Sequence, residues 1–193
     1  MRIAVVGWGS LIWNPGGLNM TGRWRPDGPH LPVEFARRSS RGRLTLAIEP
    51  SSEEQPTYWA VLGLTQLDEA RSNLREREGA RYEEAIKSVR RADRDITGDA
   101  IAGRIRRWMD AHPDIDAVMW TGLASTLTGT RASIIAQAVA YLRSLDVVSA
   151  DYANAREYVV KTPPQVQTAV RREMRAHGWA DEPAPPGLIE GRS

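Results

Sequence analysis

An α+β fold with a small mixed sheet or barrel is predicted for this 193-residue chain from three observations. Segments with strand patterns are concentrated in the first half, whereas amphipathic helical patterns dominate the second half. The composition, with 41% apolar and 26% charged residues, is that of a globular protein with enough apolar side chains for a core. The length fits a single domain, which we place at residues 1–180.

The strand predictions rest on short apolar runs. Residues 3–6 form a run that ends at Gly7, which is typical of a buried strand. Further along, Leu44, Leu46 and Ile48 alternate with smaller side chains, as in a strand with one buried face. The predicted strands span residues 3–6, 32–36, 43–48, 58–64, 81–89 and 117–123.

The helix predictions rest on apolar side chains at helical spacing and on end signals. The first predicted helix has Asp68 and Glu69 in its first turn, and Gly79 follows its last turn. The last predicted helix has Pro163 near its start and Gly178 after its end. The predicted helices span residues 67–78, 98–111, 130–145, 152–160 and 163–177.

Two segments are expected to lie outside regular structure. Residues 14–32 are rich in glycine and proline and predict a long irregular loop, a length that is uncommon unless the loop is functional. Residues 181–193 predict a loose tail, and residues 189–193 within it resemble a protease-recognition scar left by cloning. We therefore leave the tail out of the fold prediction.

Charge, cysteine content and apolar run lengths exclude several classes of function. Lys and Arg total 26 against 24 acidic residues, and the arginines are scattered, so we expect no nucleic-acid partner. The chain has no cysteine, which excludes disulfides and thiolate catalysis. No apolar run approaches the roughly 20 residues that cross a bilayer, and the N-terminus lacks signal-peptide features. We expect a cytoplasmic protein without a membrane partner, whose oligomeric state the sequence leaves open.

The sequence carries no convincing cofactor or metal motif. Gly7-Trp8-Gly9 follows a predicted strand, but a dinucleotide fingerprint needs a third glycine at the position of Ile12. The three histidines are isolated in the sequence and fit surface or helix-end positions better than a metal site. We therefore expect no cofactor and no metal.

The first candidate site is the loop that follows the first strand. Glycines at positions 7 and 9 let the backbone turn sharply and approach another group closely. The N–H groups of Gly9, Ser10 and Leu11 are then able to face an anion or a carbonyl oxygen. The same spacing also fits an ordinary glycine turn between core tryptophans.

The second candidate is a carboxylate at the end of the first predicted helix. At 100° per residue, Glu78 continues the apolar stripe of Leu74, whereas Glu76 lies nearly opposite. Burial and the negative end of the helix dipole both disfavour a charged carboxylate there, and so costly an arrangement is typical of a general acid or base. Alternatively, the helix frays and Glu78 is solvated or paired with Arg77 or Arg81.

Taken together, the two candidate segments resemble the gamma-glutamyl cyclotransferase-like family. The family's Gly-Tyr-Gly-Ser-Leu-Ile-Trp loop, as found in its glutathione-specific branch, is similar to Gly7-Trp8-Gly9-Ser10-Leu11-Ile12-Trp13. Residues 74–79 are similar to the segment with the family's catalytic glutamate, which falls on Glu78, and Tyr82 matches the tyrosine that opens the next strand. Residues 156–158 are weakly similar to the family's C-terminal part.

The resemblance implies a small mixed β-barrel with flanking helices and an enzyme of glutathione metabolism, classed as a transferase or lyase. Such an enzyme releases 5-oxoproline from a γ-glutamyl amide without a cofactor, with Glu78 as the catalytic proton carrier. The implied substrate-binding residues are Gly7, Trp8, Gly9, Ser10, Leu11, Ile12 and Tyr82.

Trp8 stands where the family has a tyrosine, so the resemblance does not determine which γ-glutamyl compound is the substrate. The leaving group can be an amino acid, a dipeptide or an amine. The main alternative is a non-catalytic member of the same fold that binds a small acid or a partner protein, with Trp8 filling part of the pocket.

Overall fold

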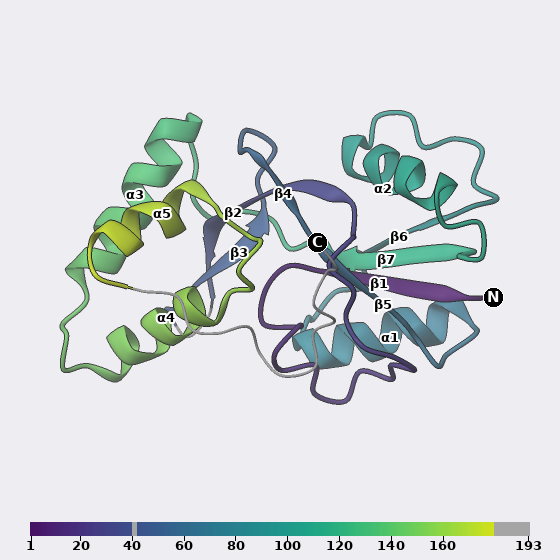
Figure 1. The fold of residues 1–193 in the computed structure, drawn as a ribbon, viewed down its shortest axis with the longest axis horizontal. Coiled ribbons are helices and arrows are strands. Elements are labelled where there is room, and N and C mark those ends of the chain that lie inside the picture. The colour runs from purple at the N-terminus through teal and green to yellow at the C-terminus, as the bar shows by residue number, and fades with distance from the viewer. Residues whose placement is uncertain (40–41, 180–193) are drawn as a thin grey trace.

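In the computed structural model, which describes residues 1–39 and 42–179, the strands form two sheets (Figure 1). The strands are β1 (Ile3–Gly7), β2 (His30–Arg38), β3 (Leu44–Ile48), β4 (Glu54–Pro56), β5 (Tyr58–Val61), β6 (Ile86–Arg90) and β7 (Ala117–Thr121). The first sheet has the order β5-β1-β7-β6, and the second has the order β3-β2-β4. The pairing of β1 with β7 is parallel and the other strand pairs are antiparallel.

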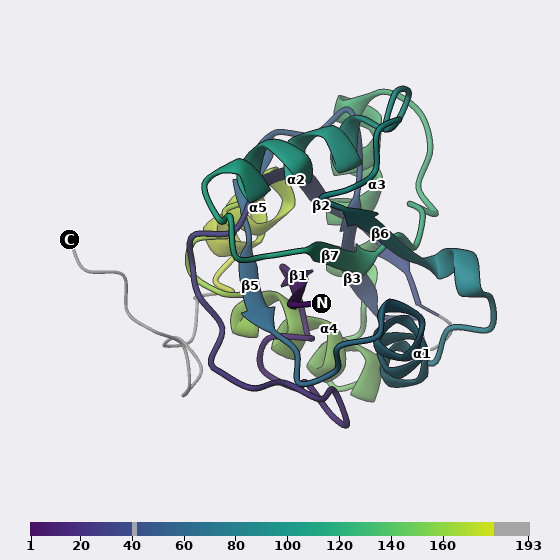
Figure 2. The same cartoon turned by 90° about the vertical axis from the view of Figure 1, so that its right-hand side faces the viewer.

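Five α-helices and one short 3₁₀ helix complete the described part of the chain. They are α1 (Leu67–Glu78), η1 (Glu83–Ala85), α2 (Ala100–Asp110), α3 (Arg131–Ser144), α4 (Ala150–Lys161) and α5 (Ala169–Ala176). Helices α2 to α5 are each preceded by a residue whose side-chain oxygen accepts a backbone N–H, which satisfies donors of the first turn. In Figures 1 and 2, α1 and α2 lie on opposite faces of the first sheet, whereas α3, α4 and α5 gather around the second sheet.

Strand β1 lies in the middle of the molecule because both of its faces are apolar. Successive side chains of a strand point to opposite faces, so Ile3 and Val5 pack with Leu74 of α1 in one core. Val6, on the other face, belongs to the second core, which contains Ile105 of α2. We call these the α1-side core and the α2-side core.

The parallel pairing places the ends of β1 and β7 at the same edge of the first sheet. Val6 is paired with Trp120, so Gly7 and Thr121 leave the sheet next to one another. This edge faces the second sheet in Figure 1. The loop after β1 therefore opens into the space between the two sheets.

The α+β class is confirmed, with most predicted elements in place. No closed barrel is found among the described residues, so the predicted barrel remains unconfirmed. Strand β4 was not predicted, and the strand expected at residues 81–89 begins only at Ile86, after η1. The predicted tail at residues 181–193 and the end of the predicted domain lie outside the described residues.

The last helix begins later than predicted. A helix is expected from residue 163, but α5 starts at Ala169. The buried guanidinium of Arg171 accounts for the difference, because it donates to the carbonyl oxygens of Thr162, Pro163 and Val166. The Pro163 carbonyl also accepts the backbone N–H of Val166 at 3.0 Å, so a single turn precedes α5 there.

Membrane-crossing helices are not found in residues 1–39 and 42–179, where no helix is both long and apolar enough to span a bilayer.

Candidate functional site

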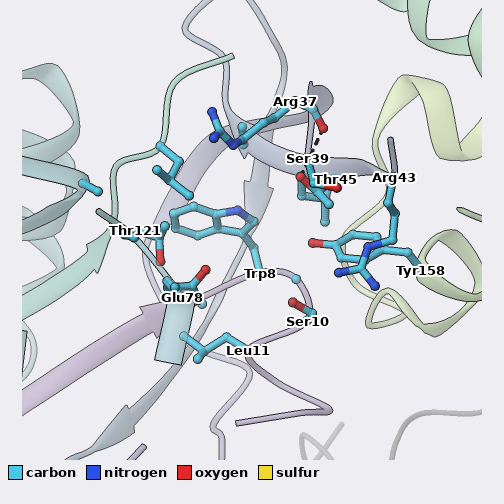
Figure 3. A pocket seen from close by; sticks show the side chains of 18 of the residues that line it. Trp8, Ser10, Leu11, Arg37, Ser39, Arg43, Thr45, Glu78, Thr121 and Tyr158 are labelled. Atoms are coloured by element: carbon cyan, nitrogen blue, oxygen red, sulfur yellow. Dashed lines mark hydrogen bonds between the residues drawn. The ribbon is translucent and has the colours of Figure 1, made fainter. Parts of the chain in front are cut away.

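A cavity of about 710 Å³ opens where the two sheets face one another (Figure 3). It is lined by the loop after β1, by β2 and β3, by the end of α1, by the end of β7 and by one residue of α4. Segments from the whole length of the chain thus meet at one place. Both sequence candidates, the glycine loop and Glu78, lie in its wall.

The structure brings most of the predicted site residues to this cavity. Those that line it are Gly7, Trp8, Gly9, Ser10, Leu11, Glu78 and Tyr82. Ile12 does not line it, because its side chain is buried in the α1-side core and its backbone N–H donates to the carbonyl of Gly9 at 3.0 Å. Tyr82 lies at the rim, with 72% of the residue exposed.

The glycine loop requires its glycines because of crowding and not because of backbone angles. Neither Gly7 nor Gly9 has a positive φ. A Cβ atom at position 9 would overlap the hydroxyl oxygen of Tyr158, and one at position 7 would lie 3.1 Å from the Trp24 ring. The expected close approach is therefore real, and Gly9 makes it to a tyrosine hydroxyl.

Glu78 ends helix α1 and points to the cavity. The helix does not fray before it, because Gly79 adopts the left-handed conformation (φ 60°) that closes the helix. Glu76 is exposed, whereas the side chain of Glu78 is only 17% exposed. This difference confirms the predicted inward position of Glu78.

The carboxylate of Glu78 is held by its neighbour. Nη1 of Arg77 lies 2.5 Å from Oε1 of Glu78, and the Arg77 side chain is only 9% exposed. Nη2 of Arg77 donates to the carbonyl oxygen of Asn14, which ties the end of α1 to the loop after β1. The alternative interpretation, in which Glu78 is paired with Arg77, is thus confirmed for the pairing but not for the fraying.

Tyr158 of α4 is a site residue that sequence reasoning did not select. Its hydroxyl is crowded against Gly9, and its ring makes an edge contact with Trp13 at 5.2 Å between centroids. Burial raises the pKa of Tyr158, and the nearby charge of Glu78 adds to this, while backbone hydrogen bonding from Ser10 opposes it. The hydroxyl therefore stays protonated near neutral pH and remains a hydrogen-bond donor. The weak similarity of residues 156–158 to the family's C-terminal part was a sequence signal for this region, but it did not single out the tyrosine.

Two arginines of the second sheet complete the wall. Arg37 of β2 donates from Nη1 to the carbonyl oxygen of Ala124 at 2.9 Å. Arg43, just before β3, places its guanidinium over the Tyr158 ring, 5.0 Å from the centroid. From the sequence, both are counted only among the scattered arginines, because no feature of the neighbouring sequence distinguishes an arginine that faces a cavity.

Trp8 occupies part of the cavity wall. It is 6% exposed and belongs to the α2-side core, yet it lines the cavity. In Figure 3 its indole stands in the middle of the labelled side chains, between Arg37 and Glu78. It therefore limits the shape of any ligand that reaches the carboxylate.

Comparison of the chain with protein-family models, with curated proteins and with solved structures finds no match. In the described part of the chain, no group of three or more His, Asp or Glu side chains is arranged to hold a metal ion. The chemistry that the site offers is proton transfer at Glu78, hydrogen bonding from Tyr158 and the loop, and anion recognition by guanidinium groups.

Proposed function

We propose that this chain is a γ-glutamyl cyclotransferase-like enzyme that releases 5-oxoproline from a γ-glutamyl amide. The observation that carries the proposal is that Glu78 and residues 7–11 line one cavity, although they are about 70 positions apart. The two motifs behind the family resemblance are independent in sequence, and a shared cavity is what a joint role requires. The residues at hand suit an intramolecular reaction that needs positioning and one proton carrier.

Binding of the glutamyl group falls to the loop and its neighbours. The backbone of residues 7–11 borders the cavity and anchors the glutamyl group, while the hydroxyl of Tyr158 supplies a further donor beside Ser10. Ile12 is left out of this role because its N–H is already bonded to Gly9. The indole of Trp8 limits the space beside the bound group and favours a folded glutamyl chain.

Glu78 carries the proton in the reaction. The α-ammonium of the substrate, with an unperturbed pKa of about 8, gives a proton to the carboxylate, and the free amine attacks its own γ-carbonyl. Glu78 gives this proton to the leaving nitrogen as the bond from the carbonyl carbon to that nitrogen breaks. The carboxylate then takes the second proton of the attacking nitrogen, which leaves one hydrogen on the ring nitrogen, and this proton passes to the departing amine. The products are 5-oxoproline and a free amine or amino acid, and water takes no part. Backbone N–H groups near Ser10 stabilise the oxyanion that develops during attack.

The barrel implied by the resemblance forms part of the same proposal. One β-bridge, between Ile48 of β3 and Ala124 after β7, links the second sheet to the first. This link supports a barrel-like arrangement of the two sheets around the cavity. A cytoplasmic location likewise remains a prediction from the sequence.

A second candidate function is binding without catalysis. The Trp8 indole in the cavity wall favours it, because Trp8 stands where the resembling family has a tyrosine and the larger ring leaves less space in the pocket. In that case γ-glutamyl compounds bind in calorimetry, but chromatography detects no 5-oxoproline.

The direct test is to incubate the protein with glutathione, γ-glutamyl dipeptides and γ-glutamylamines and to quantify 5-oxoproline. We expect release from at least one class, and we expect Glu78→Gln to lower kcat by about 10²- to 10⁴-fold, the usual contribution of a general acid or base. The substitution keeps the shape of the side chain but removes the charge that pairs with the buried Arg77, so we expect a lower melting temperature. Turnover is therefore compared at a temperature where both proteins are folded.

Glu84→Gln is the matched control, because Glu84 is exposed and lies outside the cavity wall. We expect its turnover to match the unmodified protein within about twofold. Undiminished turnover in Glu78→Gln would contradict the mechanism. Binding without any product from all three substrate classes would favour the second candidate.

A further inference from the structure

The cavity carries more positive than negative side chains. Its charged lining residues, among those described, are Arg37, Arg43, Arg81 and Glu78. Glu78 is already ion-paired with Arg77, so the described wall offers no free carboxylate to balance the three guanidinium groups. A γ-glutamyl group has one ammonium and one carboxylate and brings no net charge. The surplus therefore favours a substrate with a second anionic group.

Arg43 is the arginine of this wall that is best placed to bind that group. Its Nε is buried without a hydrogen-bond partner, and none of the described carboxylates pairs with its guanidinium. Its contact is with the ring of Tyr158, which leaves the guanidinium donors available. The Nε itself is covered by protein, so a ligand meets the rest of the guanidinium, which lines the cavity and carries a charge that no described carboxylate balances.

The position of Arg43 identifies which part of the substrate it meets. A second hollow of about 790 Å³ adjoins the first, and the two share Ser10, Arg43, Glu78 and Gly79. The reacting carbonyl must lie near Glu78, which returns the proton to the leaving nitrogen. A leaving group that extends from there toward the second hollow passes the guanidinium of Arg43, which Figure 3 shows beside Tyr158 on the side of Ser10.

We propose that Arg43 is a specificity-determining residue that binds a carboxylate on the leaving group. The substrate class is then a γ-glutamyl amino acid or peptide and not a γ-glutamylamine. This inference rests on the proposed function, because it assigns the substrate of the same site. It follows from a planar guanidinium that offers two parallel donors to a carboxylate.

The test compares two substrates of nearly equal shape, γ-glutamylglycine and γ-glutamylglycinamide, which differ by one carboxylate. We expect the unmodified protein to prefer the acid by roughly 10- to 100-fold in kcat/KM, the range of a hydrogen bond to a charged group. Arg43→Gln should reduce that preference to about threefold or less, mainly through KM for the acid. Arg43→Lys should keep part of it, since the charge remains but the paired donors are lost.

Arg107→Gln, an exposed arginine of α2 outside the cavity, controls for the loss of one positive charge. Equal turnover of both substrates by the unmodified protein, or an unchanged preference in Arg43→Gln, overturns the inference and leaves the proposed function standing. If Arg43→Gln does not fold, an unchanged preference in Arg43→Lys has the same meaning.

Failure of the proposed function is recognised separately. If neither substrate yields 5-oxoproline, calorimetry with the same pair still reports on Arg43. Tighter binding of the acid that is lost in Arg43→Gln supports the anion site even without catalysis. Equal binding of the two compounds, or none, overturns it.

Discussion

The two walls of the cavity differ in how their charged groups are partnered. On the wall made by α1 and the glycine loop, Glu78 is paired with Arg77, which is also bonded to the carbonyl of Asn14. On the wall made by β2, β3 and α4, the Nε of Arg43 is buried without a partner. The first wall holds a carboxylate in a fixed position, which suits proton transfer. The second wall presents positive charge to the cavity, which suits recognition of an anion.

The difference shows that burial alone does not identify a functional charge. Glu34 of β2 is more buried than Glu78, at 2% exposure, but it does not line the cavity. Its carboxylate instead accepts the backbone N–H groups of Phe35 and Ala169 and so caps the start of α5. What separates the two glutamates is access to a ligand-sized space.

The largest effect is expected at Gly9, where the glycine loop of the first wall contacts Tyr158 of the second wall. Gly9→Ala places a methyl group against the Tyr158 hydroxyl, so the loop or α4 must move. We expect a loss of about 1–3 kcal/mol in the free energy of unfolding, as for other overpacked sites, and a larger relative loss of 5-oxoproline release. Denaturant unfolding and the turnover assay measure the two effects.

Tyr158→Phe provides the control for that clash, because it removes only the hydroxyl. In the double variant Gly9→Ala with Tyr158→Phe, we expect part of the lost stability to return. Additive effects of the two substitutions would show that the walls do not meet at this contact.

Glu34, which links β2 of the second wall to the start of α5, is tested by the pH dependence of stability. Burial raises the pKa of Glu34 from its ordinary value of 4.5, although Thr168 and the backbone N–H groups around it oppose the shift. The folded protein then holds this proton more tightly than the unfolded chain. The free energy of unfolding therefore falls as pH rises from about 4.5 through the folded pKa, and this contribution is constant above it.

Glu34→Gln removes that titration. We expect its free energy of unfolding, measured in urea across about pH 4 to 8, to decline less over this window than that of the unmodified protein. Parallel curves for the two proteins would mean that Glu34 keeps its ordinary pKa in the folded state.

The smallest effect is expected at the rim. Tyr82 lines the cavity but is largely exposed, so its hydroxyl competes with water for any ligand contact. We expect Tyr82→Phe to change kcat/KM by about twofold or less, within the usual range for exposed sites. A tenfold loss in kcat/KM would mean that Tyr82 binds the substrate directly, which would contradict its assignment to the rim.

Much of the first wall could be predicted because its signals are local. The end of α1 at Gly79, the inward side of Glu78 and the strand before the glycine loop all follow from periodicity and end signals within a few residues. The pairing of Glu78 with Arg77 was among the alternatives that the sequence left open, together with solvation and pairing with Arg81. Ile12 was assigned to the site only because the motif includes it.

The second wall escaped prediction because its contacts join distant segments. Tyr158 meets Gly9 across most of the chain, and Arg43 meets Tyr158 only when α4 packs against β3. The late start of α5 was not predicted either, because it depends on a buried side chain. The guanidinium of Arg171 donates hydrogen bonds to the carbonyl oxygens of the residues before the helix.

The sequence by itself determined the α+β class, most elements and the two candidate motifs, since these depend on neighbours along the chain. Only the tertiary structure decided which side chains share the cavity, because side-chain proximity there is set by packing of elements and not by sequence spacing.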